Sequence, residues 1–149
     1  MSAEATIDLP APQHFGIVVR DIQKAVEYYT ATWGLGPWTF IDNNPTKENM
    51  FVGEPFKLTV AMAEWGPVVV ELLQPVEGTS VWSEFLHEHG EGLHHICHVV
   101  PNFDEVVTQY EERGFKMLAG ARFSPTIRWC YFQTTPGGLI QEFLEAGEL

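Results

Sequence analysis

Two histidines and two glutamates occupy matching points in two similar stretches of this chain. His14 leads one short apolar run and His95 leads another, while Glu71 and Glu142 each interrupt an apolar stretch further along. A carboxylate inside an apolar strand is costly unless it is paired or coordinates an ion. Imidazole and carboxylate together are common ligands of divalent transition metals. We therefore interpret His14, Glu71, His95 and Glu142 as four ligands of one divalent ion, which could be Zn, Co, Ni, Mn or Fe.

This ligand set suggests a particular chemistry. Two neutral imidazoles and two carboxylates carry a charge that balances a divalent cation. A six-coordinate ion would keep two positions for water or for substrate oxygens. A metal that binds a substrate carbonyl acts as a Lewis acid and makes the neighbouring C–H bond more acidic. We expect a small-molecule carbonyl substrate.

The elements that must position these residues form two similar units. In the first, we expect a strand over 13–19, a helix that begins at Asp21 and ends at Gly34, and strands over 38–41, 56–64 and 68–73. In the second, we expect a strand over 93–100, a helix over 102–113 stopped by Gly114, and strands over 115–118, 127–133 and 139–145.

The predicted fold class follows from this repeat. We predict an α+β protein with two βαβββ units in tandem, at 13–73 and 93–145. A linker over 74–92 joins the units and carries a helix around 80–89. We expect the units to form curved mixed sheets around one shared metal-containing cleft, within a single domain that spans 1–149. The loop at 43–55 accounts for the greater length of the first unit.

Composition excludes several classes of function. The formal charge is −12, the pI is about 4.7, and only 8 residues are Lys or Arg. Too few basic residues are present to neutralise a nucleic-acid backbone or to bind an anionic membrane surface. The segment 1–10 has no basic or apolar signal block, and no apolar run is long enough to span a membrane. We expect a cytoplasmic protein whose two cysteines, Cys97 and Cys130, are reduced.

Three sequence blocks carry a family resemblance. Val70-Glu71-Leu72-Leu73-Gln74-Pro75, Gly90-Glu91-Gly92-Leu93-His94-His95-Ile96 and Gly137-Gly138-Leu139-Ile140-Gln141-Glu142 resemble blocks of the vicinal oxygen chelate superfamily, which includes glyoxalase I, extradiol dioxygenases and bleomycin-resistance proteins. The resemblance covers 13–145 and is closest to methylmalonyl-CoA epimerase-like members. It implies the same four metal ligands, and it favours a homodimer because the superfamily commonly dimerises.

The resemblance implies an isomerase that works by proton transfer. Such an epimerase or racemase needs a base on one face of the substrate and an acid on the other. Glu142 is our candidate for one of them. The family pattern places the second just before the third strand, where Glu54 is the nearest match and Glu48 is the competing candidate.

The substrate is open between two chemical types. A methylmalonyl-CoA-like thioester needs anion contacts, for which Arg128 is a candidate. An apolar or aromatic ketone would suit the aromatic residues that we expect to line the cleft. His94 and His98 are expected to face away from His95 on their strand. Two alternative functions remain: a glyoxalase-I-like lyase or isomerase, and a ligand-binding or resistance protein without turnover. The proposed substrate-binding residues are Trp38, Phe40, Phe123, Arg128 and Trp129.

Overall fold

The computed structural model describes residues 7–134 and 136–146, so most of the segment 1–10 lies outside the described residues. The first half of the chain contains the five expected elements in the expected order. They are β1 (His14–Val18), α1 (Ile22–Trp33), β2 (Thr39–Asn43), β4 (Lys57–Trp65) and β5 (Val68–Glu77).

The second half repeats this order after an intervening helix. The elements are α2 (Val81–His89), β6 (Gly92–Val99), α3 (Phe103–Glu112), β7 (Met117–Ser124), β8 (Ile127–Gln133) and β9 (Ile140–Ala146). The α+β class with two βαβββ units is therefore confirmed. The division into units at 13–73 and 93–145 stays a prediction, since β5 continues to Glu77 and β6 begins at Gly92.

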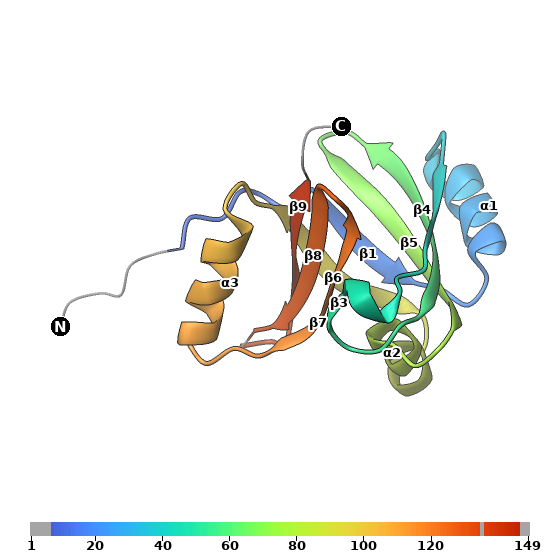
Figure 1. Ribbon diagram of the computed structural model, residues 1–149. Helices are drawn as coiled ribbons and strands as arrows, with labels where there is room; N and C mark the ends of the chain where they lie inside the picture. Colours follow the sequence, from blue (N-terminus) through green and yellow to red (C-terminus); the bar gives the residue numbers. More distant parts are fainter. Residues whose placement is uncertain (1–6, 135, 147–149) are drawn as a thin grey trace.

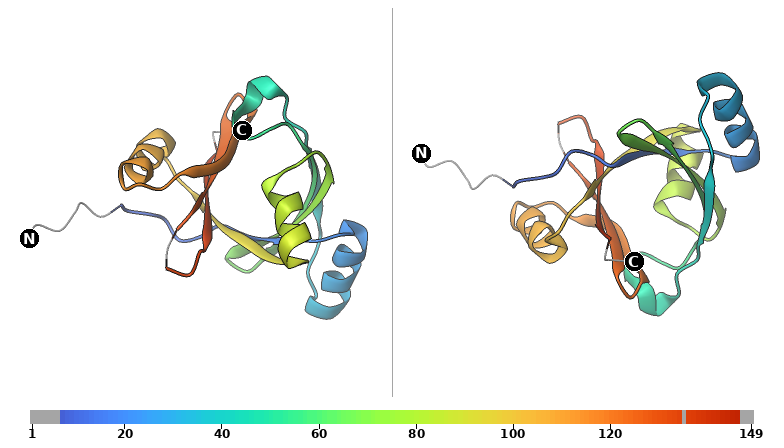
Figure 2. Two further views of the ribbon diagram at one scale, coloured as in Figure 1. Left: turned by 90° about the horizontal axis from the view of Figure 1, so that it is seen from below. Right: turned by 90° about the horizontal axis from the view of Figure 1, so that it is seen from above.

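Within the described residues, nine strands form one sheet in the order β2-β4-β5-β1-β6-β9-β8-β7-β3. The two leading strands, β1 and β6, lie antiparallel at its centre. Each pairs on its other side, in parallel, with the last strand of its own half, β5 or β9. The sheet curls around a common axis, and α1 and α3 lie on its outside (Figure 1 and Figure 2). The two halves therefore meet through the strands that carry the two candidate histidines.

Local sequence signals explain the first helix. Asp21 accepts a hydrogen bond from the backbone N–H of Lys24, which caps the N-terminus of α1. The helix ends at Gly34, whose φ of 71° lies in the left-handed region that glycine adopts easily. Ile22 is buried, and α1 packs on the outer face of the sheet through one of three apolar clusters.

Apolar side chains pack on both faces of the curled sheet. One outer cluster lies beneath α1 and a second beneath α3, where Val106, Phe132 and Phe143 are fully buried. The inner cluster combines residues of both halves with Trp82 of α2, which is only 2% exposed and packs against Trp129. The helix α2, expected within the linker, thus packs against residues of both halves of the sheet.

The segment at 43–55 differs from the expected simple loop. It contains a 3-10 helix, η1 (Lys47–Asn49), and a short strand, β3 (Met50–Val52), which pairs with β7 of the other half. A strand of three residues is too short to show a periodic sequence pattern, so this pairing between distant segments could not be predicted from the sequence. Among the described residues, no helix is long and apolar enough to cross a membrane.

Candidate metal centre

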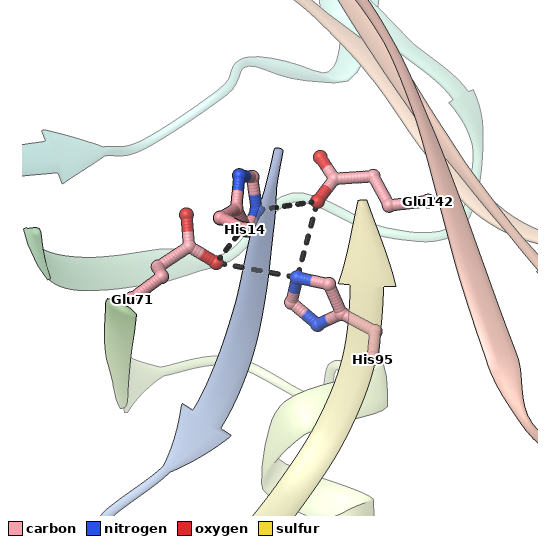
Figure 3. A group of neighbouring side chains, drawn as sticks. All are labelled: His14, Glu71, His95 and Glu142. Carbon is pink, nitrogen blue, oxygen red and sulfur yellow. Dashed lines mark hydrogen bonds and ion pairs between the residues drawn. The ribbon is translucent and has the colours of Figure 1, made fainter. Parts of the chain in front are cut away.

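Strand register brings the four predicted ligands together. In the β1–β5 pair Gly16 lies opposite Glu71, and in the β6–β9 pair Cys97 lies opposite Glu142. Side chains two residues apart on a strand share a face, so each glutamate lies on the face of the histidine that leads its half. Because β1 and β6 are neighbours, the two His/Glu pairs converge on one point (Figure 3).

The ligand atoms form a ring in which nitrogen and oxygen alternate. His14 Nε2 lies 3.5 Å from Glu71 Oε1 and 3.2 Å from Glu142 Oε1, while His95 Nε2 lies 3.3 Å and 3.1 Å from the same two oxygens. Two atoms bonded to one ion at about 2.1 Å are separated by about 3.0 Å at right angles and about 3.4 Å at the tetrahedral angle. The spacing therefore fits four ligands of a single transition-metal ion.

Burial supports the same interpretation. The exposed fractions are 3% for His14, 8% for Glu71, 0% for His95 and 7% for Glu142. Glu71 Oε1 and His95 Nε2 are buried without a hydrogen-bond partner among the described residues, although both point into the ring. Buried polar atoms normally have partners, and a bound ion would supply one for both. The His/Glu cluster can therefore bind a metal, whose identity the ligand set leaves open between several divalent ions.

Electrostatics within the cluster are strongly coupled. Burial alone would lower the pKa of each histidine, but the two glutamates, joined at His14 by a hydrogen bond with Cys97, outweigh it and raise the pKa of both His14 and His95. Burial would raise the pKa of each glutamate, but the histidines lower the pKa of both. The cluster thus stabilises charged carboxylates, which is the state that binds a cation, and protonated histidines, which must lose their protons when a cation binds. Burial, followed by the charge of Glu142, raises the pKa of the Cys97 thiol to about 12. Burial therefore favours the neutral thiol of Cys97, which lies opposite His14.

The partners of the outer ring nitrogens form a second repeated feature. Gln13 Oε1 lies 2.6 Å from Nδ1 of His14, and His94 Nδ1 lies 2.9 Å from Nδ1 of His95. In each half, the residue just before the ligand histidine approaches it from the side away from the cluster. His98, in contrast, is within hydrogen-bonding distance of the Pro10 carbonyl oxygen and faces Phe143 of an outer cluster.

The prediction that His94 faces away from His95 is wrong. Gly16 pairs with His95 but the next residue, Ile17, pairs with Leu93, so the β1–β6 register shifts by one residue at His94. Such a bulge disturbs the alternation of side chains between faces. His94 is consequently 4% exposed and packs against the inner-cluster residue Trp82 and against Tyr131.

The two predicted partners of Glu142 in proton transfer are both exposed. Glu48 is exposed on η1, and Glu54 is exposed beside a hollow of about 240 Å³ that Phe56 and Trp82 also line. The structure shows neither in contact with the four ligands. Sequence reasoning passed over Glu64, which lines a larger hollow of about 750 Å³ together with Gln13, the neighbour of His14. Side chains alternate between the two faces of a strand, so the inner-face positions Leu58 and Val60 of β4 would have predicted that Glu64 also lies on the inner face.

The structure separates the predicted substrate-binding residues. Trp129 is buried on the inner face, where its Nε1 has no partner among the described residues. Trp38 packs in the outer cluster beneath α1, and Phe40 lies opposite Ala61 of that same cluster. Arg128 is paired with Asp104 of α3 and with Glu145, so it lies on the outer face. Phe123 is 43% exposed on β7. Of the five, only Trp129 is placed in the inner cluster.

Comparison with known proteins agrees with this fold. The model of the glyoxalase/bleomycin resistance protein/dioxygenase superfamily matches residues 13–131. That range covers most of the chain and carries three of the four ligands. The chain therefore belongs to this superfamily, as its sequence blocks indicated.

Individual proteins are also similar to this chain. An uncharacterized protein of Bacillus subtilis, YqjC, is 34% identical over 105 residues, which cover 70% of this chain and 68% of that protein. Mitochondrial methylmalonyl-CoA epimerase of Bos taurus is 26% identical over 144 residues, covering 89% of this chain and 73% of that protein. A structure of Streptomyces coelicolor methylmalonyl-CoA epimerase with 2-nitronate-propionyl-CoA superposes with a TM-score of 0.72 at 23% identity, covering 95% and 100% of the two chains.

Proposed function

We propose that this protein is a divalent-metal-dependent epimerase or racemase. It removes a proton from the carbon next to a carbonyl and returns it to either face. The observation that carries this proposal is the buried ring of His14, Glu71, His95 and Glu142, in which neighbouring nitrogen and oxygen atoms lie 3.1 to 3.5 Å apart. The similarity to a bovine protein named methylmalonyl-CoA epimerase supports an isomerase of this type.

The four residues would hold the ion through Nε2 of each histidine and Oε1 of each glutamate. A divalent ion bound there supplies Lewis-acid polarisation of a carbonyl oxygen and so acidifies the adjacent C–H bond. The low exposure of the ligands keeps bulk water from this position, which strengthens every charge interaction within it. The two carboxylates neutralise the ion, so a neutral or monoanionic substrate group meets no large excess of charge.

Proton transfer needs a group on each side of the reacting carbon. Glu142 directs Oε1 into the ring while its other carboxylate oxygen points away from it, which suits Glu142 to hold the proton on one side (Figure 3). For the opposite side we propose one of three carboxylates. Glu48 and Glu54 come from the family pattern. Glu64 lines the hollow beside Gln13 and lies opposite Val69, which in turn lies opposite His14.

The surroundings of the site bear on the substrate. The hollow of about 750 Å³ is lined by apolar residues such as Pro37 and Met62 and by the polar Gln13 and Thr39. Met62 lies opposite Glu71 on the neighbouring strand, and Gln13 precedes His14, so two lining residues of the hollow adjoin candidate ligands along or across the strands. We propose a small-molecule carbonyl substrate, either an acyl thioester of the methylmalonyl-CoA type or an apolar or aromatic ketone. A homodimer and a cytoplasmic location remain predictions.

Proton exchange tests this proposal directly. The purified protein is loaded with Zn²⁺, Co²⁺, Mn²⁺ or Ni²⁺ and incubated in D₂O with methylmalonyl-CoA or with an α-chiral aryl ketone. We expect deuterium at the α carbon, an unchanged carbon skeleton, and loss of exchange when a chelator removes the ion. Glu48→Gln, Glu54→Gln and Glu64→Gln serve as controls for one another. The true partner of Glu142 is the one whose loss abolishes inversion at the α carbon while the metal affinity is kept, because Glu142 alone still exchanges the proton on its own face.

Other outcomes would contradict the proposal in distinct ways. A metal-loaded protein that exchanges no proton in either class of compound is not the proposed epimerase. A change of skeleton that depends on glutathione would instead identify a glyoxalase-I-like lyase or isomerase. Tight binding of a compound without any exchange would identify a ligand-binding protein.

A further inference from the structure

The residue just before each ligand histidine contacts the nitrogen of that histidine that faces away from the ring. This arrangement recurs in both halves, with Gln13 beside His14 and His94 beside His95. We propose that His94 is a positioning residue. It accepts the Nδ1–H of His95 and so holds His95 in the tautomer that presents a bare Nε2 to the metal. The inference rests on the metal site of the proposed function.

Proton accounting fixes the direction of this hydrogen bond. The two Nδ1 atoms lie 2.9 Å apart, so one must carry a proton and the other must accept it. His95 Nε2 points at Glu71 Oε1 and Glu142 Oε1, where a metal ligand has no proton. When a metal is bound, His95 is neutral and its single proton is therefore on Nδ1. His94 must accept through its own Nδ1 and carry its proton on Nε2.

The surroundings of His94 make it suited to this role. Its ring lies 5.1 Å from Phe85, edge to face, and 5.5 Å from Tyr131, and its Nε2 has no hydrogen-bond partner among the described residues. A neutral imidazole surrounded by aromatic rings keeps its acceptor nitrogen free of competing donors. The only polar contact of the His94 side chain recorded in the described residues is the one to His95.

Backbone structure orients the pair. The register shift between Gly16 and Ile17 leaves His94 without an opposite residue on β1, so its side chain turns towards that of His95. His95 is fully buried, and its imidazole lies directly over Gly16. The ring therefore has glycine on one side and the acceptor His94 at its outer nitrogen, and it needs both to stay in place.

The counterpart in the first half is weaker. Gln13 is exposed, so water can replace its amide oxygen if the side chain is removed. His94 is 4% exposed, and no such replacement is open to it. Residues that orient a metal ligand in this way typically contribute about 10- to 100-fold to metal affinity. We expect that range for His94 and a smaller effect for Gln13.

Three variants separate the hydrogen bond from packing. His94→Phe keeps an aromatic ring against Phe85 but removes the acceptor. His94→Asn restores an acceptor close to the position of Nδ1. His98→Phe is the matched control, because His98 is also buried and hydrogen-bonded on β6 but faces away from the site. Affinity for Zn²⁺ is measured by competition with a chromogenic chelator, and unfolding of the metal-free proteins is followed in parallel.

The expected result is a loss of about 10- to 100-fold in Zn²⁺ affinity for His94→Phe. His94→Asn should stay within a few fold of the wild type, and His98→Phe should match it even if its unfolding temperature falls. In addition, ¹⁵N NMR of the Zn²⁺-loaded wild type should show His95 protonated at Nδ1 and His94 protonated at Nε2. Either an unchanged affinity in His94→Phe or the opposite tautomers would overturn the inference.

The same experiments distinguish this inference from the proposed reaction. If the variants behave as expected but no substrate exchanges its α proton, the reaction is wrong and the positioning role stands. If exchange occurs and His94→Phe binds Zn²⁺ normally, the positioning role is wrong and the reaction stands. A wild type that binds no divalent ion under metal-replete conditions would overturn both.

Discussion

A single methyl group at Gly16 should displace a metal ligand. A Cβ atom built on Gly16 would lie 2.2 Å from Cε1, 2.7 Å from Nε2 and 2.8 Å from Nδ1 of the His95 ring. Carbon atoms in contact are normally about 3.5 Å or more apart. In Gly16→Ala the imidazole must therefore move by roughly 1 Å or more away from β1. Since His95 is fully buried, the surrounding side chains must move with it.

The structure sets the size of both effects. Overpacking of a dense interior costs about 1–3 kcal/mol, which is the expected loss of stability in the metal-free variant. Metal affinity should also fall, because Nε2 of His95 lies only 3.1 Å from Glu142 Oε1 and 3.3 Å from Glu71 Oε1 in the ring. A shift of that size opens the ring. We expect metal affinity to fall by at least the roughly 100-fold that marks the upper limit for losing a ligand's hydrogen-bond partner.

The assay is a chelator competition titration of Gly16→Ala beside Gly92→Ala. Gly92 begins β6 on the strand of His95, and a Cβ there would meet nothing within 4 Å. Its backbone is not in the left-handed region, so alanine is accommodated. We expect Gly92→Ala to bind metal as the wild type does. Wild-type affinity in a folded Gly16→Ala protein would refute the reasoning, because His95 would then not need the space above Gly16.

Three further outcomes are expected. Chelation should lower the unfolding temperature, by about 5–10 °C when the ion had been present at 100 times its dissociation constant, as measured by calorimetry. Asp21→Ala removes the cap of α1 and should cost about 1 kcal/mol in denaturant unfolding with unchanged metal affinity. Arg128→Met should lower the unfolding temperature at neutral pH while metal affinity is retained, since Arg128 lies on the outer face. Hydrogen bonds with Arg128 lower the pKa of Asp104 and Glu145, so this contribution is present above their unfolded pKa values near 4 and is lost as the pH falls. Melting curves of wild type and Arg128→Met should therefore converge as the pH falls below about 4; a constant gap would contradict that origin.

The convergence of the four His and Glu residues could be predicted because the signal occurs twice. A histidine that leads a strand says little by itself, and so does one glutamate among apolar residues. The repeat adds the missing constraint. Glu71 lies opposite Gly16, two residues after His14, and Glu142 lies opposite Cys97, two residues after His95. One register rule therefore applies in both halves, and matching sequence patterns were sufficient to reveal it.

Features that depend on contacts between the halves could not be predicted in this way. The short strand β3 forms only because β7 offers it an edge. Arg128 alternates with Trp129 along β8, but the sequence does not say which of the two faces inward. The structure decides this through Asp104, whose helix lies on the outer side. The orientation of His94 depends on a bulge, and a shift of one residue reverses every expectation based on alternation.

The two halves supply equivalent candidate ligands, but the residues that surround the two histidines differ. Each contributes one histidine and one glutamate, so neither half alone has the full ligand set, and a bound ion would link β1 to β6 as well as β5 to β9. At equivalent positions, however, the first half has Gly16 and the second has Cys97, and the outer partners are the exposed Gln13 and the buried His94. His95 therefore depends on space at Gly16 and on a buried acceptor, whereas the partner of His14 can be replaced by water. It follows that substitutions around His95 should weaken metal binding more than equivalent substitutions around His14, although the four ligands themselves are related by the repeat.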